Sequence, residues 1–518
     1  MAIIDFYDRG WDINPEGVAY IQGDRCYSFR EVGELSCRIA NCLLGFGLPR
    51  ETKGAIWSGN DVTGWACTLG LWRANMAWIP VNARNSIADN HYILENFDCD
   101  IMFYHSEFAE VIAEIRPGLP KIQHWVCIDS TGANAPSLEA WVAQAASTRP
   151  SVPFDMDDVV MLSSTGGTTG HPKGVMNTHR SLQTFIAHFM LACPYDADEN
   201  PVNLAAAPMT HTAGLLAVPC TAQGGTVVVV TKPDPALIFA AIARHRVTEF
   251  FLPPTVIYKL LEIPGIEKID MSSVKYLMYG AAPMSVDKLK KAIELWGPIM
   301  AGGYGQTEAP ASISNLPPGH HFVKGKLASD ERLSSVGRPN PLIRVEVMND
   351  ANEILPLGET GEICVRGDLV MKGYYKQPDK TAETIIDGWL HTGDIGSIDA
   401  EGYLHITDRK KDMIISGGFN VYPSEVEQVI WSHPAVQDCA VIGVPDEKWG
   451  EAVKAVIELN QGQTVDPQEI IELCKSKLGS VMAPKTVDIV ASLPRSTVGK
   501  VLKKDLREQY WQSSGRKV

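Results

Sequence analysis

A regular alternation of short apolar runs with amphipathic segments after residue 155 constrains the fold most strongly. In one unit, the β-branched run at residues 227–230 is followed by a turn and a segment that opens with Asp234-Pro235. Aspartate is a favoured helix N-cap and proline is favoured at the first helical position, so this segment predicts a helix after a strand. Repeated strand and helix units are typical of a parallel sheet with crossover helices, and we therefore predict an α/β fold.

Two loops that follow predicted strands carry residues suited to ligand binding. The run 274–279 predicts a strand that leads into Gly280-Ala281-Ala282, and the run 159–162 leads into SSTGGTTGHPKG at residues 163–174. In open parallel sheets, ligands bind at loops that leave the carboxyl ends of strands. We therefore expect these loops to face one binding site.

The charge balance argues against a protein that binds nucleic acid through a basic surface. The chain has 46 Lys and Arg against 61 Asp and Glu, a formal net charge of -15, and its basic clusters are no longer than Arg409-Lys410-Lys411. Nucleic-acid binding by counterion release needs a basic face. An anionic ligand would therefore have to be held by a local site.

Cysteine usage and hydropathy indicate the compartment. The 11 cysteines include no CxxC pair, which is typical of reduced, buried thiols in a reducing compartment. The first residues, MAIIDFYDRGWD, lack a secretory signal pattern, and no apolar run of about 18 residues occurs. We expect a cytoplasmic protein without a transmembrane segment.

The length of 518 residues predicts more than one domain. Short strands and turns indicate a small β-rich subdomain at about 335–408, and a charged run follows at 408–412. We predict a large N-terminal domain of parallel-rich sheets with helices at 1–410. A small α+β C-terminal domain would follow at 411–518.

The loop at 163–174 combines glycines, hydroxyls and one lysine, which suit a phosphate cradle. It does not match GxxxxGK[ST], because Lys173 is preceded by Pro172 and followed by Gly174. Taken alone, a loop of this composition could equally be a surface turn. Other segments of the chain have to decide between these interpretations.

Six segments supply that decision through their order and spacing. They are SSTGGTTGHPKG (163–174), PMTHTAG (208–214), GYGQTE (303–308), WLHTGD (389–394), DRKKDMIISGG (408–418) and LPRSTVGK (493–500). In this order the chain resembles the acyl-adenylate-forming superfamily over nearly its whole length, from about residue 15 to 510. That superfamily comprises acyl- and aryl-CoA synthetases, adenylation domains of peptide synthetases and firefly-type luciferases.

The resemblance implies a reaction in two steps. A carboxylate first attacks the α-phosphate of ATP to give an acyl-AMP and pyrophosphate, and a thiol then displaces AMP. Negative charge gathers on the phosphates in the first step, so catalysis would depend on positioning and electrostatic stabilisation.

The same resemblance assigns the residues around the phosphates and Mg²⁺. The β- and γ-phosphates would be held by Thr165, Gly167, Thr168, Thr169 and Lys173. Thr307 would donate to the α-phosphate, and Glu308 would ligate Mg²⁺, which prefers oxygen ligands. Gly166 departs from the family pattern, in which serine is usual, so Ser164 or backbone amides would have to supply the missing donor.

The resemblance also assigns the nucleoside site. The adenine would lie between Tyr304 and the small residues Gly280, Ala281 and Ala282. The ribose hydroxyls would donate to Asp394, and Arg409 would reach the same sugar.

The remaining implied residues concern the reacting groups. Lys500 would enter the first-step site from the small domain and bridge the carboxylate and the α-phosphate. The small domain would then rotate at a hinge at Lys411, as few-residue hinges allow. This rotation would bring Gly417, Gly418 and Trp449 to the CoA thiol. His211 would lie between the acyl pocket and the thiol entry.

The leading hypothesis is therefore an AMP-forming acid:CoA ligase that uses ATP and Mg²⁺. No Lys or Arg occurs in the segments expected to line the acyl pocket, so we predict a monocarboxylic acid with an apolar tail or ring. A freestanding adenylation enzyme that loads a carrier protein is the main alternative. A luciferase-like oxygenase and a non-catalytic nucleotide sensor are further alternatives, and a homodimer is compatible with each of them.

Overall fold

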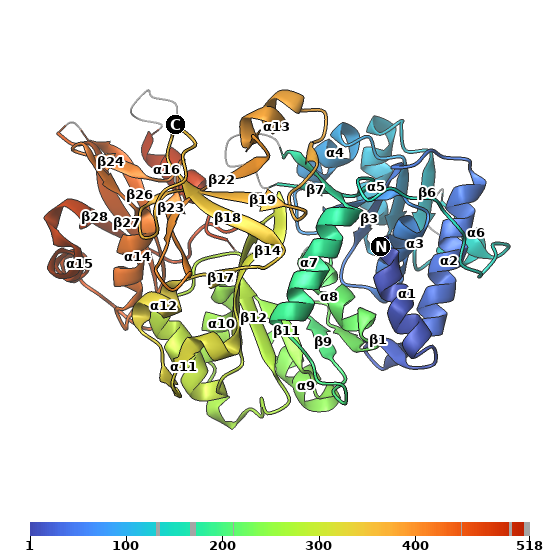
Figure 1. The fold of residues 1–518 in the computed structure, drawn as a ribbon, viewed down its shortest axis with the longest axis horizontal. Helices are drawn as coiled ribbons and strands as arrows, with labels where there is room; N and C mark the ends of the chain where they lie inside the picture. Colours follow the sequence, from blue (N-terminus) through green and yellow to red (C-terminus); the bar gives the residue numbers. More distant parts are fainter. Residues whose placement is uncertain (131–134, 166–171, 211, 447, 497–499, 512–518) are drawn as a thin grey trace.

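A computed structural model describes residues 1–130, 135–165, 172–210, 212–446, 448–496 and 500–511 (Figure 1). It confirms the predicted α/β class. Two large mixed sheets with helices on their faces form the N-terminal part, and two smaller sheets follow along the chain. Among the described residues, no helix is both long and apolar enough to cross a membrane.

The first large sheet has seven strands and carries the loop that begins at Thr165. Its order is β20 (Gly373–Tyr374), β8 (Gly174–Thr178), β7 (Val159–Ser164), β4 (Ala77–Asn82), β3 (Lys53–Ser58), β5 (Ile101–Tyr104) and β6 (His124–Cys127). Strands β7, β4, β3, β5 and β6 are parallel, whereas β8 and β20 each run antiparallel to their neighbour. The associated helices include α2 (Phe29–Gly45), α3 (Val62–Arg73) and α4 (Ile87–Asn96).

The second large sheet has nine strands and carries the loop that follows residue 280. Its order is β17 (Arg338–Pro339), β14 (Ala309–Leu316), β13 (Met300–Gln306), β12 (Tyr276–Gly280), β11 (Glu249–Leu252), β9 (Val202–Ala205), β10 (Thr226–Val229), β1 (Val18–Gln22) and β2 (Arg25–Ser28). The helices between these strands are α8 (Thr212–Ala222), α9 (Pro235–His245), α10 (Pro254–Leu261) and α11 (Val286–Trp296). The predicted cap at Asp234 is confirmed, because its side chain accepts from a backbone amide in the first turn of α9, and Ser285 caps α11 in the same way.

Helices α7 (His179–Ala192) and α8 lie between the two large sheets (Figure 1). Residues 213–222 of α8 are all buried, as expected for a helix that is apolar on every side. The largest core cluster joins side chains from both sheets with those of the two helices, such as Trp78, Phe185, Leu216 and Met278. Both sheets therefore share one hydrophobic core.

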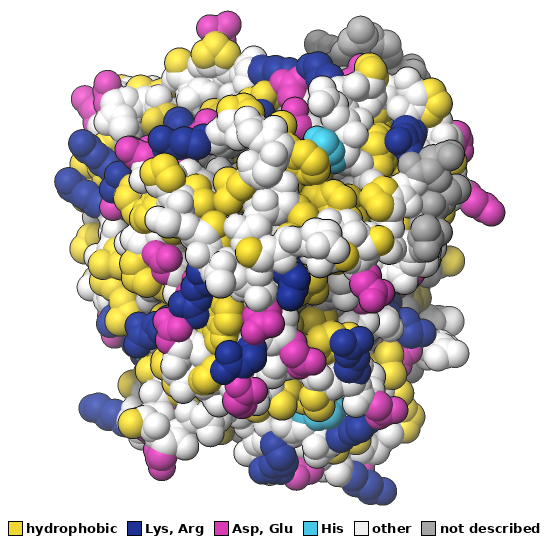
Figure 2. Space-filling view, turned by 90° about the vertical axis from the view of Figure 1, so that its right-hand side faces the viewer, with side chains coloured by type: hydrophobic (Ala, Val, Ile, Leu, Met, Phe, Trp, Pro, Cys, Tyr) yellow, Lys and Arg dark blue, Asp and Glu magenta, His cyan; other side chains and the backbone are white. Residues whose placement is uncertain are grey.

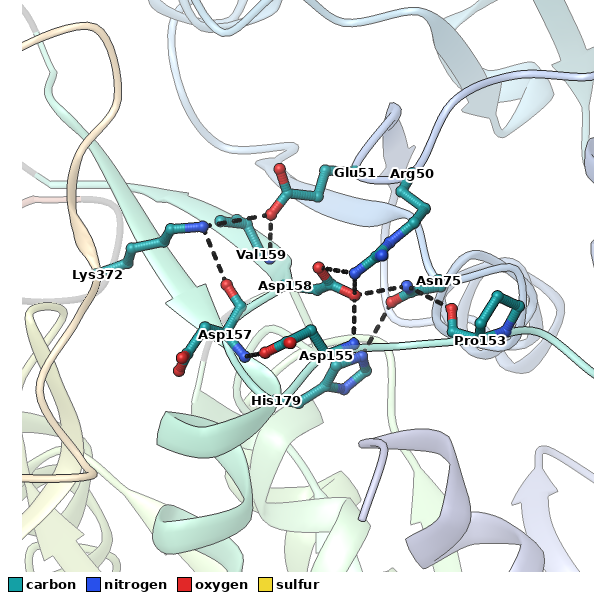
Figure 3. A network of polar contacts seen from close by, with 10 residues as sticks. All are labelled: Arg50, Glu51, Asn75, Pro153, Asp155, Asp157, Asp158, Val159, His179 and Lys372. Carbon is teal, nitrogen blue, oxygen red and sulfur yellow. Dashed lines mark hydrogen bonds and ion pairs between the residues drawn. The ribbon is translucent and has the colours of Figure 1, made fainter.

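A network of polar side chains fixes the start of β7 (Figure 3). The carboxylate of Asp158 accepts from Arg50, from Asn75 at 2.8 Å and from the amide of Asp155 at 2.7 Å. Burial raises the pKa of Asp158, but these bonds outweigh it and leave the pKa below its usual value. His179 Nε2 lies 3.0 Å from Asn75 Oδ1, so the network also ties the start of α7 to the sheet.

Two smaller sheets of five strands each follow the large sheets along the chain. One contains β18 (Ile343–Met348), β19 (Gly361–Gly367), β22 (Trp389–Ile398), β21 (Ile385–Ile386) and β23 (Leu404–Arg409). The other contains β25 (Phe419–Val421), β24 (Ile414–Ser416), β27 (Gly450–Leu459), β26 (Val436–Asp446) and β28 (Thr486–Val490), with α14 (Pro423–Trp431), α15 (Pro467–Met482) and α16 (Lys503–Trp511). The last sheet packs on a core cluster of its own, which includes Val426, Ile430 and Val453.

The molecular face at the right of Figure 1 is drawn in space-filling form in Figure 2. Lys and Arg side chains are interspersed there with Asp and Glu, and apolar side chains lie between them. In the described part of this face no basic band is visible. The distribution agrees with the net charge of -15 and gives no extended positive surface on this side.

Candidate active site

The loop after β7 begins at Thr165, whose amide donates to the Lys173 carbonyl at 3.0 Å and so closes the neck of the loop. Thr165 Oγ1 is buried and has no hydrogen-bond partner among the described residues. A buried hydroxyl without a partner is costly unless a ligand or solvent pairs with it. This oxygen therefore suits a polar ligand. Of the other predicted cradle residues, Gly167, Thr168 and Thr169 lie outside the described residues, as does Gly166.

Lys173 and Glu308 are brought together through Tyr374. The Lys173 ammonium lies 3.8 Å from the centroid of the Tyr374 ring, and the Tyr374 hydroxyl donates to Glu308 Oε1 at 2.7 Å. Burial lowers the pKa of Lys173, and the Glu308 carboxylate opposes this effect. A cation and a carboxylate thus stand at the mouth of the predicted phosphate loop.

Thr307 and Glu308 occupy the turn between β13 and β14. The Thr307 carbonyl accepts from Asn177 Nδ2 at 3.4 Å, and the Glu308 carbonyl accepts from the Met371 amide at 2.8 Å. These bonds connect the turn to the other large sheet and to the segment before β20. The buried Nε2 atom of Gln306 has no partner among the described residues. Together with the Thr165 hydroxyl, it is a second unpaired polar group suited to a ligand.

The residues predicted to contact the adenine, Gly280, Ala281 and Ala282, lie at the end of β12 and just after it. Gly280 pairs with Gly303 of β13, and a Cβ atom on Gly280 would lie only 2.5 Å from the Gly303 carbonyl oxygen. Ala281 has φ of +66°, a left-handed conformation that is unfavourable for residues other than glycine. Such strain is concentrated at ligand sites, so this conformation supports a binding role for the loop.

Asp394 is held at both carboxylate oxygens. Oδ2 accepts from the Tyr304 hydroxyl at 2.6 Å, and Oδ1 lies 3.0 Å from Arg409 Nε. Burial and then the nearby Asp394 carboxylate raise the pKa of Tyr304 well above its usual value, so Tyr304 remains a donor. Asp394 also raises the pKa of Arg409. The predicted ribose acceptor is thereby fixed from two sides.

Lys500 follows the last sheet along the chain. The Ser496 amide donates to the Lys500 carbonyl at 2.7 Å. Lys500 is exposed to solvent as a residue, yet desolvation of its ammonium lowers its pKa. Arg409 adds to the lowering, whereas Asp394 and Glu308 oppose it. These four charged groups are therefore near enough to influence one another.

The segment that carries Lys411 is a tight turn next to Arg409. The amides of Asp412 and Met413 both donate to the Arg409 carbonyl, at 2.9 and 3.2 Å. Arg507 of α16 donates to Asp412 Oδ1 at 2.7 Å and contacts the Lys411 carbonyl at 3.5 Å. Burial lowers the pKa of Lys411, and Arg409 adds to this effect.

The predicted CoA residues lie together at the turn between β24 and β25. The Gly417 amide donates to the Trp449 carbonyl at 2.8 Å, and a Cβ atom on Gly417 would lie 2.6 Å from the Trp449 ring. Gly417 and Gly418 have φ of +60° and +84°, which glycine adopts without strain. His211 lies outside the described residues.

These segments thus bring hydroxyls, an amide donor, cations and carboxylates together near the carboxyl ends of β7 and β12. Such a donor set fits a polyphosphate nucleotide, and the structure defines an α/β enzyme of the class that binds one. Two family models match the chain: that of AMP-binding enzymes over residues 8–375, and that of their C-terminal domain over residues 425–500. The chain belongs to the AMP-binding enzyme family.

Curated relatives and solved structures agree with this assignment. The chain is 38% identical to the medium/long-chain-fatty-acid–CoA ligase FadD8 of Mycobacterium tuberculosis, over 84% of this chain and 77% of the relative. It is 32% identical to a feruloyl-CoA synthase of Amycolatopsis, over 96% of this chain and 97% of the relative. The structure of the amide bond synthetase McbA from Marinactinospora thermotolerans superposes with a TM-score of 0.89 at 28% identity, over 98% and 100% of the two chains.

These relatives confirm two predictions made from the motifs. The chain falls in the acyl-CoA synthetase branch of the superfamily, and it is an acid–thiol ligase of the AMP-forming type. The roles assigned to individual residues remain predictions.

The motifs did not identify Tyr374, although it contacts two predicted site residues. It lies in the run Gly373-Tyr374-Tyr375, which carries no charge and no distinctive spacing. The pairing of β20 with β8 places it in the site, and that pairing joins segments nearly 200 residues apart. No signal in the local sequence could have revealed it.

Proposed function

We propose that the protein is an ATP-dependent carboxylic acid:CoA ligase that forms an acyl-AMP, releases pyrophosphate and then transfers the acyl group to CoA. The observation that carries this proposal is the fixed carboxylate of Asp394, which lies 3.0 Å from Arg409 Nε and accepts from Tyr304 at 2.6 Å, with the charges of Lys500 and Glu308 nearby. These residues come from distant parts of the chain, and each has a role in adenylation implied by its motif.

Lys500 would stabilise the first step. Its ammonium can donate both to the attacking carboxylate and to the α-phosphate, and thereby offset the charge that develops between two anions. Thr307 would donate to the same phosphate, while Lys173 would hold the distal phosphates. Asp394 and Arg409 would fix the ribose and so align the α-phosphate for in-line attack.

The residues present fit Mg²⁺ as a partner of ATP. Glu308 supplies one carboxylate beside the phosphate loop, and Mg²⁺ is typically bound by one or two carboxylates together with phosphate oxygens and water. When bound, the ion would neutralise phosphate charge. Lys173, which lies over the ring of Tyr374 while Glu308 accepts from its hydroxyl, would act on the same phosphates without occupying the carboxylate.

A small cavity lies between α7, α8, β11 and β12. It measures about 10 Å³ and is lined by Phe189, Met190, Cys193, Leu216, Pro219, Gln223, Glu249 and Met278. A space of this size holds about one water molecule, so an acyl tail would enter it only if the lining side chains moved apart. The cavity lies along α8, which begins next to His211, and along β12, which ends at Gly280. We propose that the tail of the acid extends toward this region.

The charge at the end of this cavity favours a monocarboxylic acid. The lining contains no Lys or Arg, and Glu249 is buried there with bonds from Asn203 and Tyr195, both at 2.9 Å. Burial raises the pKa of Glu249. A second substrate carboxylate would meet an acidic group and no cation, which is unfavourable. We therefore propose a medium-chain, long-chain or aryl acid with an apolar tail.

The second step would require a rearrangement around Lys411. In this arrangement Lys500 faces the nucleotide site, and a rotation at Lys411 would bring Gly417, Gly418 and Trp449 to the acyl-AMP. We propose that the domains divide at this position, with 1–410 as the nucleotide-binding unit and 411–518 as the mobile one. The exposed Trp449 ring, 38% accessible, would then cover the thiol.

A panel of short, medium, long and aryl acids tests the proposed function. Pyrophosphate release is measured with ATP and each acid, with and without CoA, and thioester formation is followed separately. We expect release with at least one apolar acid and thioester only when CoA is present. Transfer to a carrier protein with CoA inert would support the alternative acceptor, and no release with any acid would refute adenylation. An amine acceptor belongs in the same panel, because McbA is an amide bond synthetase.

A further inference from the structure

Tyr374 lies at the junction of the two large sheets, beside the predicted phosphate loop. In the register of β20 and β8, Tyr374 pairs with Val175, and the Tyr375 amide donates to the Gly174 carbonyl at 2.8 Å. Its side chain is buried, with 4% of the residue exposed. The backbone of Tyr374 is therefore fixed within two residues of Lys173.

The side chain of Tyr374 contacts two groups of opposite charge. The hydroxyl donates to Glu308 Oε1 at 2.7 Å, and the ring face carries the Lys173 ammonium at 3.8 Å from its centroid. A hydrogen bond to a carboxylate directs its remaining lone pairs, and a cation over an aromatic face is attracted by the ring quadrupole. One rigid side chain thus sets both the direction of the carboxylate and the place of the ammonium.

The segment around Tyr374 is anchored on both sides. Before it, the Lys372 ammonium donates to the Asp157 carbonyl at 3.0 Å and lies 3.6 Å from Glu51, within the network at the start of β7 (Figure 3). After it, the Thr381 hydroxyl accepts from the Tyr374 amide at 2.9 Å. A side chain held in this way can orient its partners without moving itself.

We propose that Tyr374 is a positioning residue that couples the magnesium ligand Glu308 to the phosphate anchor Lys173. The proposal rests on the proposed function, because it concerns the same Mg·ATP site. The hydroxyl leaves Glu308 Oε2 and the second lone pair of Oε1 for the metal, while the ring keeps Lys173 from pairing directly with Glu308. Without the hydroxyl, the carboxylate can turn away from the metal position. Without the ring as well, it can pair with the ammonium, and both groups are then lost to the phosphates.

Two variants separate the contributions of the hydroxyl and the ring. Tyr374→Phe removes the bond to Glu308 and keeps the aromatic face, whereas Tyr374→Leu removes both. Tyr375→Phe is a matched control, because Tyr375 directly follows β20 and its hydroxyl also donates to a carboxylate, that of Asp98, at 2.7 Å. Thermal midpoints within a few degrees of the control establish that the variants fold.

Calorimetry of ATP binding over a Mg²⁺ titration, without any acid, provides the test. We expect Tyr374→Phe to raise the Mg²⁺ concentration for half-maximal ATP binding by about tenfold, the size expected for a group that orients a metal ligand. Metal-free ATP binding should weaken only in Tyr374→Leu. Tyr375→Phe should match the wild type.

The outcomes distinguish this proposal from the function on which it rests. If the wild type binds Mg·ATP and Tyr374→Phe shows the same Mg²⁺ dependence, the positioning role is refuted and the ligase assignment stands. If the wild type binds neither ATP nor Mg·ATP, both proposals are wrong. An equal loss in Tyr374→Phe and Tyr375→Phe would mean that the strand, not the bond to Glu308, is responsible, and would also refute the role.

Discussion

Asp394 and Arg409 pair across neighbouring strands, and Arg409 Nε lies 3.0 Å from Asp394 Oδ1. The other oxygen, Oδ2, accepts from Tyr304 at 2.6 Å. Because both oxygens are held, the carboxylate keeps one orientation before any sugar binds. A ribose that donates to Asp394 thus meets a preorganised acceptor, which reduces the entropy cost of binding.

Asp394→Asn should weaken ATP binding by at least about tenfold, because charge-assisted hydrogen bonds are roughly twice as strong as neutral ones. Calorimetric titration with ATP measures this effect directly. Asp399→Asn is a suitable control, since Asp399 directly follows β22 and its carboxylate lies 3.0 Å from Nε2 of His405 in β23. Unchanged ATP affinity in Asp394→Asn would contradict a ribose role for this carboxylate.

Lys500→Ala should lower the rate of pyrophosphate release by about a hundredfold or more, the loss typical of a donor aimed at developing charge. The variant should still convert supplied acyl-AMP and CoA to thioester, because Lys500 is assigned only to the first step. Lys504→Ala controls for loss of a nearby lysine, since the Lys504 ammonium lies 3.5 Å from Glu508 within α16. Pyrophosphate release near the wild-type rate in Lys500→Ala would make the assignment wrong.

Local physical rules predicted much of the fold but only part of the site. The caps at Asp234 and Ser285 could be predicted because capping depends on a few adjacent residues. The bond from Tyr304 to Asp394 could not, because it joins strands of different sheets that are 90 residues apart. Tyr374 was missed for the same reason.

The remaining site residues could be predicted only from the motifs that contain them. Lys500 is one lysine among many, and only the segment LPRSTVGK distinguished it. The structure adds that the pKa of Lys500 responds to Arg409, Asp394 and Glu308. The sequence motifs could identify these residues, but they could not predict the arrangement of sheets that brings the residues near one another.

Gly417→Ala should impair thioester formation while leaving pyrophosphate release largely intact. The added Cβ would lie 2.6 Å from the Trp449 ring, and φ of +60° is unfavourable for alanine. Gly462→Ala separates the two effects, because Gly462 has φ of +76° and no atom within 4 Å of its added Cβ. If both variants lost thioester formation equally, backbone strain rather than the contact with Trp449 would be the cause.

Acidification from pH 7 to pH 5 should destabilise the protein through buried histidines. His179, His188 and His321 are almost fully buried, and burial lowers the pKa of each to about 4. In the unfolded chain a histidine has a pKa of about 6.5, so between these values the unfolded state binds more protons than the folded state. The free energy of unfolding is therefore highest above pH 6.5 and decreases as the pH falls toward 4.

For one such histidine the full loss is about 3 kcal/mol. Thermal midpoints measured at pH 7, 6 and 5 should decrease stepwise, in a range where carboxylates of ordinary pKa hardly titrate. His179→Gln removes one titrating group, so this variant should show a smaller decrease between pH 7 and 5 even if its midpoint at pH 7 is lower. In the wild type, Nε2 of His179 lies 3.0 Å from Asn75 Oδ1 and Nδ1 accepts from the Ile3 amide at 2.9 Å, so protonation at Nδ1 would break the bond from Ile3 in addition to charging a buried ring. A midpoint that is constant from pH 7 to 5, or a decrease in His179→Gln as large as in the wild type, would contradict this explanation.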